Sequence, residues 1–155
     1  MITNRDELKK TTTTIQSIFN VGINLKISAH EELNKLLGFS VDTPLSSDAL
    51  QGSVPDGIDP KCFTTLLALY NQGKQLMAES SQKMTDVWAP IVLHIIETKY
   101  AEYKKYHNTL YYEGISGLYI GMHLSYSNMV DALYKHICLE INEFLSKKGL
   151  TYDHQ

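Results

Sequence analysis

Two histidine–glutamate pairs are the residues of this chain whose types and spacing could hold a metal ion. His94 lies three residues before Glu97, and His136 lies four residues before Glu140, so each pair would share one face of a helix. Two helices that each offer an imidazole and a carboxylate can bind a divalent metal in the core of a bundle. Known di-iron bundles place glutamate before histidine and use two further glutamates. The pairs therefore support only an alternative hypothesis, a metal- or ligand-binding enzyme or carrier with a site between helices.

A concentration of tyrosines suggests a second kind of chemistry, the recognition of another molecule. Eight of the ten tyrosines lie between residues 100 and 134, and tyrosine is enriched at binding hot spots because it joins a large apolar area to a hydroxyl group. Lysines lie among them, and such a mixture can also stack single-stranded bases. The net charge of −3 and the use of lysine for every basic residue except Arg5 disfavour nucleic acid. We expect a protein partner to contact Tyr103, Tyr106, Tyr111 and Tyr112.

Residues 39–59 form a third candidate region, called the acidic loop below. Prolines and glycines punctuate it as they punctuate turns, and Ser47–Leu50 has the composition of a single helical turn. The loop contains no lysine or arginine, so its carboxylates can steer association with a basic partner. These partner-binding candidates are Asp42, Asp48, Asp56 and Asp59.

Small residues recur at four-residue spacing near the end of the chain, at Gly117, Gly121 and Ser125. On a helix they would line one narrow stripe. Each glycine costs a helix about 1 kcal/mol relative to alanine, which indicates that the stripe has a purpose. A stripe without side chains lets another helix approach the backbone closely. We expect it to serve close packing within the chain or the contact surface of a homodimer.

The sequence favours a protein without catalytic activity and predicts no cofactor, because no nucleophile–base set can be assigned from spacing. Cys62 and Cys138 form no CxxC pattern, and we expect both to be buried thiols in a reducing compartment. Residues 1–10 lack the apolar stretch of a signal peptide. The longest apolar run, residues 88–96, is far shorter than the ~20 residues of a membrane span. These observations predict a cytoplasmic protein outside the membrane.

The apolar pattern predicts an all-α bundle of about five helices that forms a single domain over residues 1–155. One helix is expected to start at Ser28, whose capping box with Glu31 would satisfy backbone donors, and to end at Gly38. The richest pattern, a heptad seam, predicts one long packed helix through residues 109–148. Apolar residues at helical spacing predict the remaining helices over residues 6–19, 60–84 and 91–107.

Two segments leave an alternative to this fold. Residues 19–27 and 118–126 both alternate between apolar and polar side chains, which is typical of strands. If they paired, the chain would be an α+β protein with a short two-stranded sheet. Such a pair is marginal unless helices cover it, so the alternative still requires most of the chain to be helical.

These patterns favour a small cytoplasmic binding protein that acts through a protein partner. An adaptor, an inhibitor or an immunity-type protein that covers a partner's active site would fit. The hypothesis depends on the acidic loop, on the tyrosines and on the lack of a catalytic motif.

Overall fold

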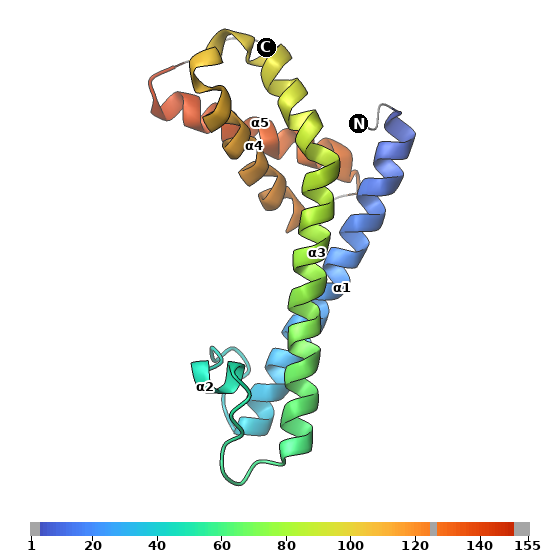
Figure 1. Cartoon of the computed structure of the whole chain (residues 1–155), viewed down its shortest axis with the longest axis vertical. Helices are drawn as coiled ribbons and strands as arrows, with labels where there is room; N and C mark the ends of the chain where they lie inside the picture. Colours follow the sequence, from blue (N-terminus) through green and yellow to red (C-terminus); the bar gives the residue numbers. More distant parts are fainter. Residues whose placement is uncertain (1–3, 125–126, 151–155) are drawn as a thin grey trace. The chain divides into compact units, whose positions relative to one another are not determined.

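The computed structural model describes residues 4–124 and 127–150 of the chain (Figure 1). These residues contain five α-helices and one short 3-10 helix, and no strand occurs among them. The prediction of an all-α bundle with about five helices is confirmed. The elements are α1 (Arg5–Leu37), α2 (Ser47–Leu50), α3 (Pro60–Lys99), η1 (Ala101–Tyr106), α4 (His107–Met122) and α5 (Met129–Lys147).

The chain divides into two compact units, and helices α1 and α3 each contribute to both. Residues 17–80 form one, called the central unit below. Residues 1–16 and 81–155 form the other, called the terminal unit. The acidic loop belongs to the central unit, whereas α4 and α5 belong to the terminal unit.

Helix α1 has a buried face whose positions recur at steps of three, four or seven residues, a pattern that suits a helix packed along one seam. Several of these positions hold small or polar side chains, so the spacing of the apolar residues alone did not predict a single continuous helix. The alternation at residues 19–27 predicted a strand wrongly, because these residues lie in α1. Two of the alternating apolar side chains, Val21 and Ile27, are 57% and 49% exposed. Ser28 lies inside α1 instead of starting a helix. The positions of this seam are Leu8, Thr12, Ile15, Phe19, Gly22, Ala29 and Leu33, and Gln16 and Asn34 of the same helix are buried as well.

Within the central unit, α1 and α3 run antiparallel and touch backbone to backbone (Figure 1). A Cβ atom on Gly73 would lie 2.6 Å from the amide nitrogen of Lys26 and 2.8 Å from the carbonyl oxygen of Gly22. A Cβ atom on Gly22 would in turn lie 2.9 Å from the carbonyl oxygen of Gly73. Any side chain at these two positions would therefore push the helices apart.

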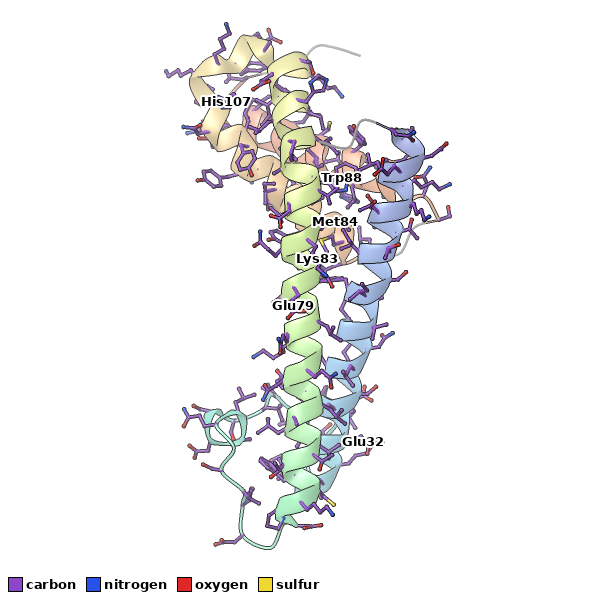
Figure 2. The ribbon with its side chains drawn as sticks, turned by 45° about the vertical axis from the view of Figure 1, so that its right-hand side comes forward. Glu32, Glu79, Lys83, Met84, Trp88 and His107 are labelled. Carbon is purple, nitrogen blue, oxygen red and sulfur yellow. The ribbon has the colours of Figure 1, made fainter. Side chains whose placement is uncertain are left out.

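The terminal unit is built around a fully buried tryptophan on α3, one turn from the buried Met84 (Figure 2). The indole nitrogen of Trp88 donates a hydrogen bond to the hydroxyl of Thr12 at 3.1 Å. Its ring meets the ring of Tyr134 edge to face, with centroids 5.2 Å apart. The polar tip of the tryptophan is thus satisfied inside the core.

Helices α4 and α5 form a close antiparallel pair in place of the single helix predicted over residues 109–148. Helix α4 ends at Met122, and α5 begins after Asn128, whose side chain accepts a hydrogen bond from the backbone nitrogen of Asp131 at 3.2 Å. Asparagine is a strong N-cap, so it starts a new helix inside the heptad pattern. The strand alternative also fails at residues 118–122, which lie in α4. Residues 125 and 126 lie outside the described part.

Because α4 and α5 are in close contact at Gly117, adding one methyl group there should lower the stability of the fold. A Cβ atom on Gly117 would lie 2.2 Å from the carbonyl oxygen of His136 on α5. We expect Gly117→Ala to lower the free energy of unfolding by about 2 kcal/mol, because overpacking against backbone outweighs the ~1 kcal/mol gained in helix propensity. Urea unfolding followed by circular dichroism measures this.

The matched control for this prediction is Ser116→Ala, because Ser116 is the exposed neighbour of Gly117 on the same helix. We expect this variant to unfold within about 0.5 kcal/mol of the parent protein. Equal stabilities of the two variants would contradict the backbone contact.

Candidate functional site

The acidic loop folds back onto the core of the central unit. Three partly buried apolar side chains of the loop, Leu45, Val54 and Ile58, pack against that core. Ala49 of α2 is part of the core itself and is 5% exposed. The remaining buried members of this core are Ala29, Leu33, Phe63 and Tyr70. The loop is therefore anchored by hydrophobic burial, and the anchors lie between its carboxylates in sequence.

Asn34, which is fully buried on α1, holds the start of the loop. Its side-chain nitrogen donates hydrogen bonds to the carbonyl oxygens of Val41 at 2.9 Å and Thr43 at 2.8 Å. A ring nitrogen of His30 lies 2.7 Å from the same oxygen of Thr43. Gly38 ends α1 with a φ of 78°, as predicted for a left-handed helix cap. These contacts fix the path of the chain as it leaves α1.

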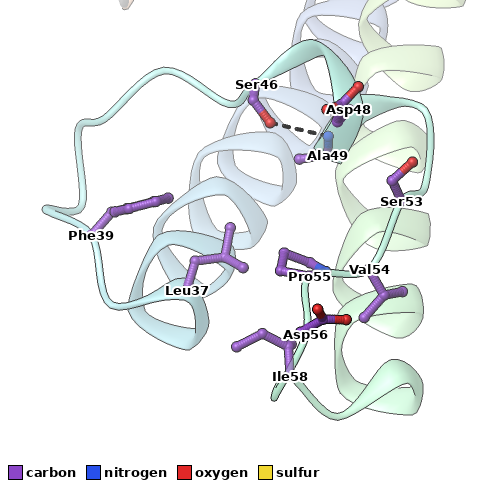
Figure 3. A pocket seen from close by; sticks show the side chains of 10 residues that line it. All are labelled: Leu37, Phe39, Ser46, Asp48, Ala49, Ser53, Val54, Pro55, Asp56 and Ile58. Carbon is purple, nitrogen blue, oxygen red and sulfur yellow. Dashed lines mark hydrogen bonds between the residues drawn. The ribbon is translucent and has the colours of Figure 1, made fainter.

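The short helix α2 confirms the single turn predicted at Ser47–Leu50. The hydroxyl of Ser46 caps it by accepting a hydrogen bond from the backbone nitrogen of Ala49 at 3.1 Å. Beside α2 lies a cavity of about 470 Å³, called the loop cavity below (Figure 3). Its lining is mostly apolar and consists of Leu37, Phe39, Ser46, Asp48, Ala49, Ser53, Val54, Pro55, Asp56 and Ile58.

The four carboxylates of the acidic loop have different roles. Asp42 accepts a hydrogen bond from the hydroxyl of Ser40 at 2.9 Å, and Asp59 caps α3 by accepting from the backbone nitrogen of Lys61 at 3.1 Å. Asp48 and Asp56 have neither an ion pair nor a side-chain hydrogen bond with any described residue, and both line the loop cavity. The sequence analysis grouped all four carboxylates as partner-binding candidates. The structure separates Asp42 and Asp59, which accept hydrogen bonds within the chain, from Asp48 and Asp56, which belong to the cavity lining.

Cys62 is an exposed free thiol, which corrects the expectation of a buried one. Its Sγ atom donates to Asp59 Oδ2 at 3.1 Å. This hydrogen bond and the nearby negative charge raise the pKa of the Cys62 thiol, and the same hydrogen bond lowers the pKa of the Asp59 carboxyl. The second free cysteine, Cys138, is half-buried.

The predicted tyrosines lie in the terminal unit and differ in their surroundings. Tyr106 packs edge to face on Phe144 with centroids 5.8 Å apart, and Tyr111 packs in the same way on Tyr112 at 5.7 Å. Tyr112 is 72% exposed. Tyr103 lines a smaller cavity of about 310 Å³, together with Ile96, Glu97, Tyr100, Ala101, Lys104 and His107.

The histidine–glutamate pairs are not brought together into a metal site. His94 and Glu97 are exposed on α3, and His136 and Glu140 are half-buried on α5. Across residues 4–124 and 127–150, no three histidine, cysteine, aspartate or glutamate side chains gather closely enough to hold a metal ion. That part of the chain therefore gives no support to the metal-site hypothesis.

The small-residue stripe on α4 is occupied by the chain's own helix. Gly117 and Gly121 are buried, and a Cβ atom on Gly121 would lie 2.7 Å from a methyl group of Leu133 on α5. Both glycines therefore serve packing between α4 and α5. The third member of the predicted stripe, Ser125, lies outside the described residues.

Comparisons with protein-family models, with curated proteins and with solved structures gave no match. In the described part of the chain, no helix combines the length and the apolar composition that crossing a bilayer requires.

The role of Asn34 predicts a defined effect on the acidic loop. Asn34→Ala removes two hydrogen bonds to loop carbonyls, and we expect it to lower the free energy of unfolding by about 2 kcal/mol. It should also speed amide hydrogen exchange in residues 39–45, because the loop loses its attachment to α1. Asn24→Ala, at an exposed position of the same helix, is the control. Equal loop exchange rates in the two variants would contradict the anchoring role.

The thiol of Cys62 should become more reactive when Asp59 loses its charge. Asp59→Asn keeps a good helix cap but removes the negative charge and weakens the hydrogen bond that raises the thiol pKa. The pKa should fall, the thiolate fraction at pH 8 should rise, and alkylation by iodoacetamide should become faster. Asp56→Asn removes the same charge elsewhere in the loop and should leave the rate unchanged. A slower reaction in Asp59→Asn would show that the assigned sign is wrong.

Proposed function

We propose that this chain is a small binding protein that acts through a protein partner held at the acidic loop. The observation that carries the proposal is the loop cavity, which combines a mostly apolar lining with two carboxylates that lack partners among the described residues. Binding sites commonly join an apolar surface to a few placed polar groups in this way. An adaptor, an inhibitor or an immunity-type protein would use such a surface to hold or cover its target.

Large exposed hydrophobic side chains of the acidic loop support the proposal. Phe39 is 57% exposed and lines the cavity itself, while Val41 and Leu50 in the same loop are 44% and 40% exposed. Aromatic residues, phenylalanine included, are enriched at the cores of protein interfaces. Burying these groups against a partner would stabilise the complex by the hydrophobic effect. The anchors of the loop hold them in place before binding, which reduces the entropy lost on association.

The proposed compartment is the cytoplasm, and the proposed partner is not a nucleic acid. Two free cysteines agree with a reducing environment, and the net charge of −3 gives no broad attraction for phosphate backbones. A homodimer would have to use a surface other than Gly117 and Gly121, because α5 covers both.

The test is site-specific photo-crosslinking followed by a binding measurement. The photoreactive residue benzoylphenylalanine would replace Leu50, which follows the cavity-lining Ala49 and is 40% exposed. In a separate variant it would replace Leu139 on α5, which is 47% exposed. After irradiation in its own cell extract, we expect the protein to form an adduct at position 50 that is weak or missing at position 139. The partner identified by mass spectrometry would then be purified and titrated calorimetrically.

The calorimetric step decides whether the captured partner uses the proposed surface. We expect Phe39→Ala to weaken its affinity by at least roughly tenfold, the effect of losing a hot-spot side chain, and Leu139→Ala to leave it unchanged. Equal crosslinking at both positions, or unchanged affinity in Phe39→Ala, would overturn the proposal.

A further inference from the structure

The two carboxylates in the loop cavity define what kind of group the partner should place there. Asp42 and Asp59 already accept hydrogen bonds from Ser40 and Lys61. Asp48 and Asp56 have no partner among the described residues, although both contribute to the cavity lining. In Figure 3, Asp48 lies on the α2 side of the cavity and Asp56 lies on the side of Pro55 and Ile58. An occupant of the cavity would therefore meet negative charge at more than one point.

No cation of the loop neutralises these charges, because residues 39–59 contain no lysine or arginine. The rest of the lining is chiefly hydrocarbon, supplied by Leu37, Phe39, Ala49, Val54, Pro55 and Ile58. Asp48 and Asp56 are exposed, so a purely apolar occupant would make no use of their charge, and a small inorganic cation would leave the apolar surface uncovered. The complementary group has a hydrocarbon stem and a positively charged end.

We propose that the loop cavity binds an arginine side chain from the partner, an inference that rests on the function proposed above. Arginine fits better than lysine for two reasons. Its guanidinium group is weakly hydrated and carries five donors, so it can pair with a carboxylate through two hydrogen bonds while its stem lies on an apolar surface. It also stacks on aromatic rings, and the exposed ring of Phe39 lines the same cavity.

The size of the cavity agrees with this occupant. Its volume of about 470 Å³ falls within the range of roughly 300–1,000 Å³ that is typical of ligand sites. The arginine side chain and part of the peptide next to it fit within such a volume. The partner would thus insert an arginine from an exposed loop or terminus.

The direct test is an NMR titration of the full chain with short capped peptides that differ at one side chain. The four probes are acetyl-Gly-Xaa-Gly-amide peptides in which Xaa is arginine, lysine, norleucine or citrulline, the neutral isostere of arginine. We expect the arginine peptide to shift the backbone amide signals of Ala49, Val54 and Ile58 saturably. The citrulline and norleucine peptides should bind at least roughly tenfold more weakly, as expected when a charge-assisted hydrogen bond is lost. The lysine peptide should bind more weakly than the arginine peptide.

Two double variants of equal net charge separate local recognition from general attraction. Asp48→Asn/Asp56→Asn removes the cavity carboxylates, and we expect it to weaken the arginine peptide at least roughly tenfold. Asp42→Asn/Asp59→Asn removes two charges outside the cavity lining but keeps side-chain oxygens that can accept the hydrogen bonds of Ser40 and Lys61. It should therefore keep the loop's structure and bind within about twofold of the parent protein. Well-dispersed amide spectra of both variants would confirm that they fold.

The outcomes distinguish this inference from the proposed function. Equal binding of the arginine and citrulline peptides, equal binding of arginine and lysine, or equal weakening in both double variants would overturn the arginine assignment. A crosslinked partner whose affinity depends on Phe39 would still support the proposed function in that case.

Discussion

The approach of two backbones at Gly22 and Gly73 is the constraint on which the central unit depends. Neither residue has room for a Cβ atom, so the two helices meet there more closely than side chains would allow. This spacing brings Leu33 of α1 and Phe63 of α3 into one core, and both are fully buried. The acidic loop covers that core through Ala49 and its neighbours. The position of the candidate site therefore depends on a contact between two glycines that lie outside the loop, on the two helices that flank it.

The features that could be predicted from the sequence are those decided by neighbouring residues. Gly38 ends α1, Ser47–Leu50 forms one turn, and Asp59 with Pro60 begins α3. Each depends on a hydrogen bond or a backbone angle within a few positions. The prediction that a helix starts at Ser28 was wrong. The residues of a capping box are present there, but packing along the seam of α1 continues the helix through Ser28. Tertiary contacts outweigh a cap when the two disagree.

The features that could not be predicted depend on which segments meet. The heptad pattern near the end of the chain is real, but it spans two helices that fold against each other, and Asn128 separates them. The acidic loop was recognised as a candidate, but its cavity was not, because the cavity exists only when Val54 and Ile58 pack back onto the helices. Likewise, the four aspartates of the loop divide into two that accept hydrogen bonds within the chain and two that belong to the cavity lining. The division depends on which groups each carboxylate meets in the folded chain, and the spacing of the aspartates in the sequence does not reveal those groups.

The single tryptophan of the chain lies in the terminal unit, where Trp88 is fully buried. Its fluorescence therefore reports the folding of one unit only. The exposed thiol of Cys62 lies in the other unit, so a dye attached there reports the second unit in the same sample. If the two optical signals coincide during denaturation, the continuous helices α1 and α3 make the chain unfold as one cooperative body. If they separate, the loop that carries the candidate site can open while the tryptophan core stays folded.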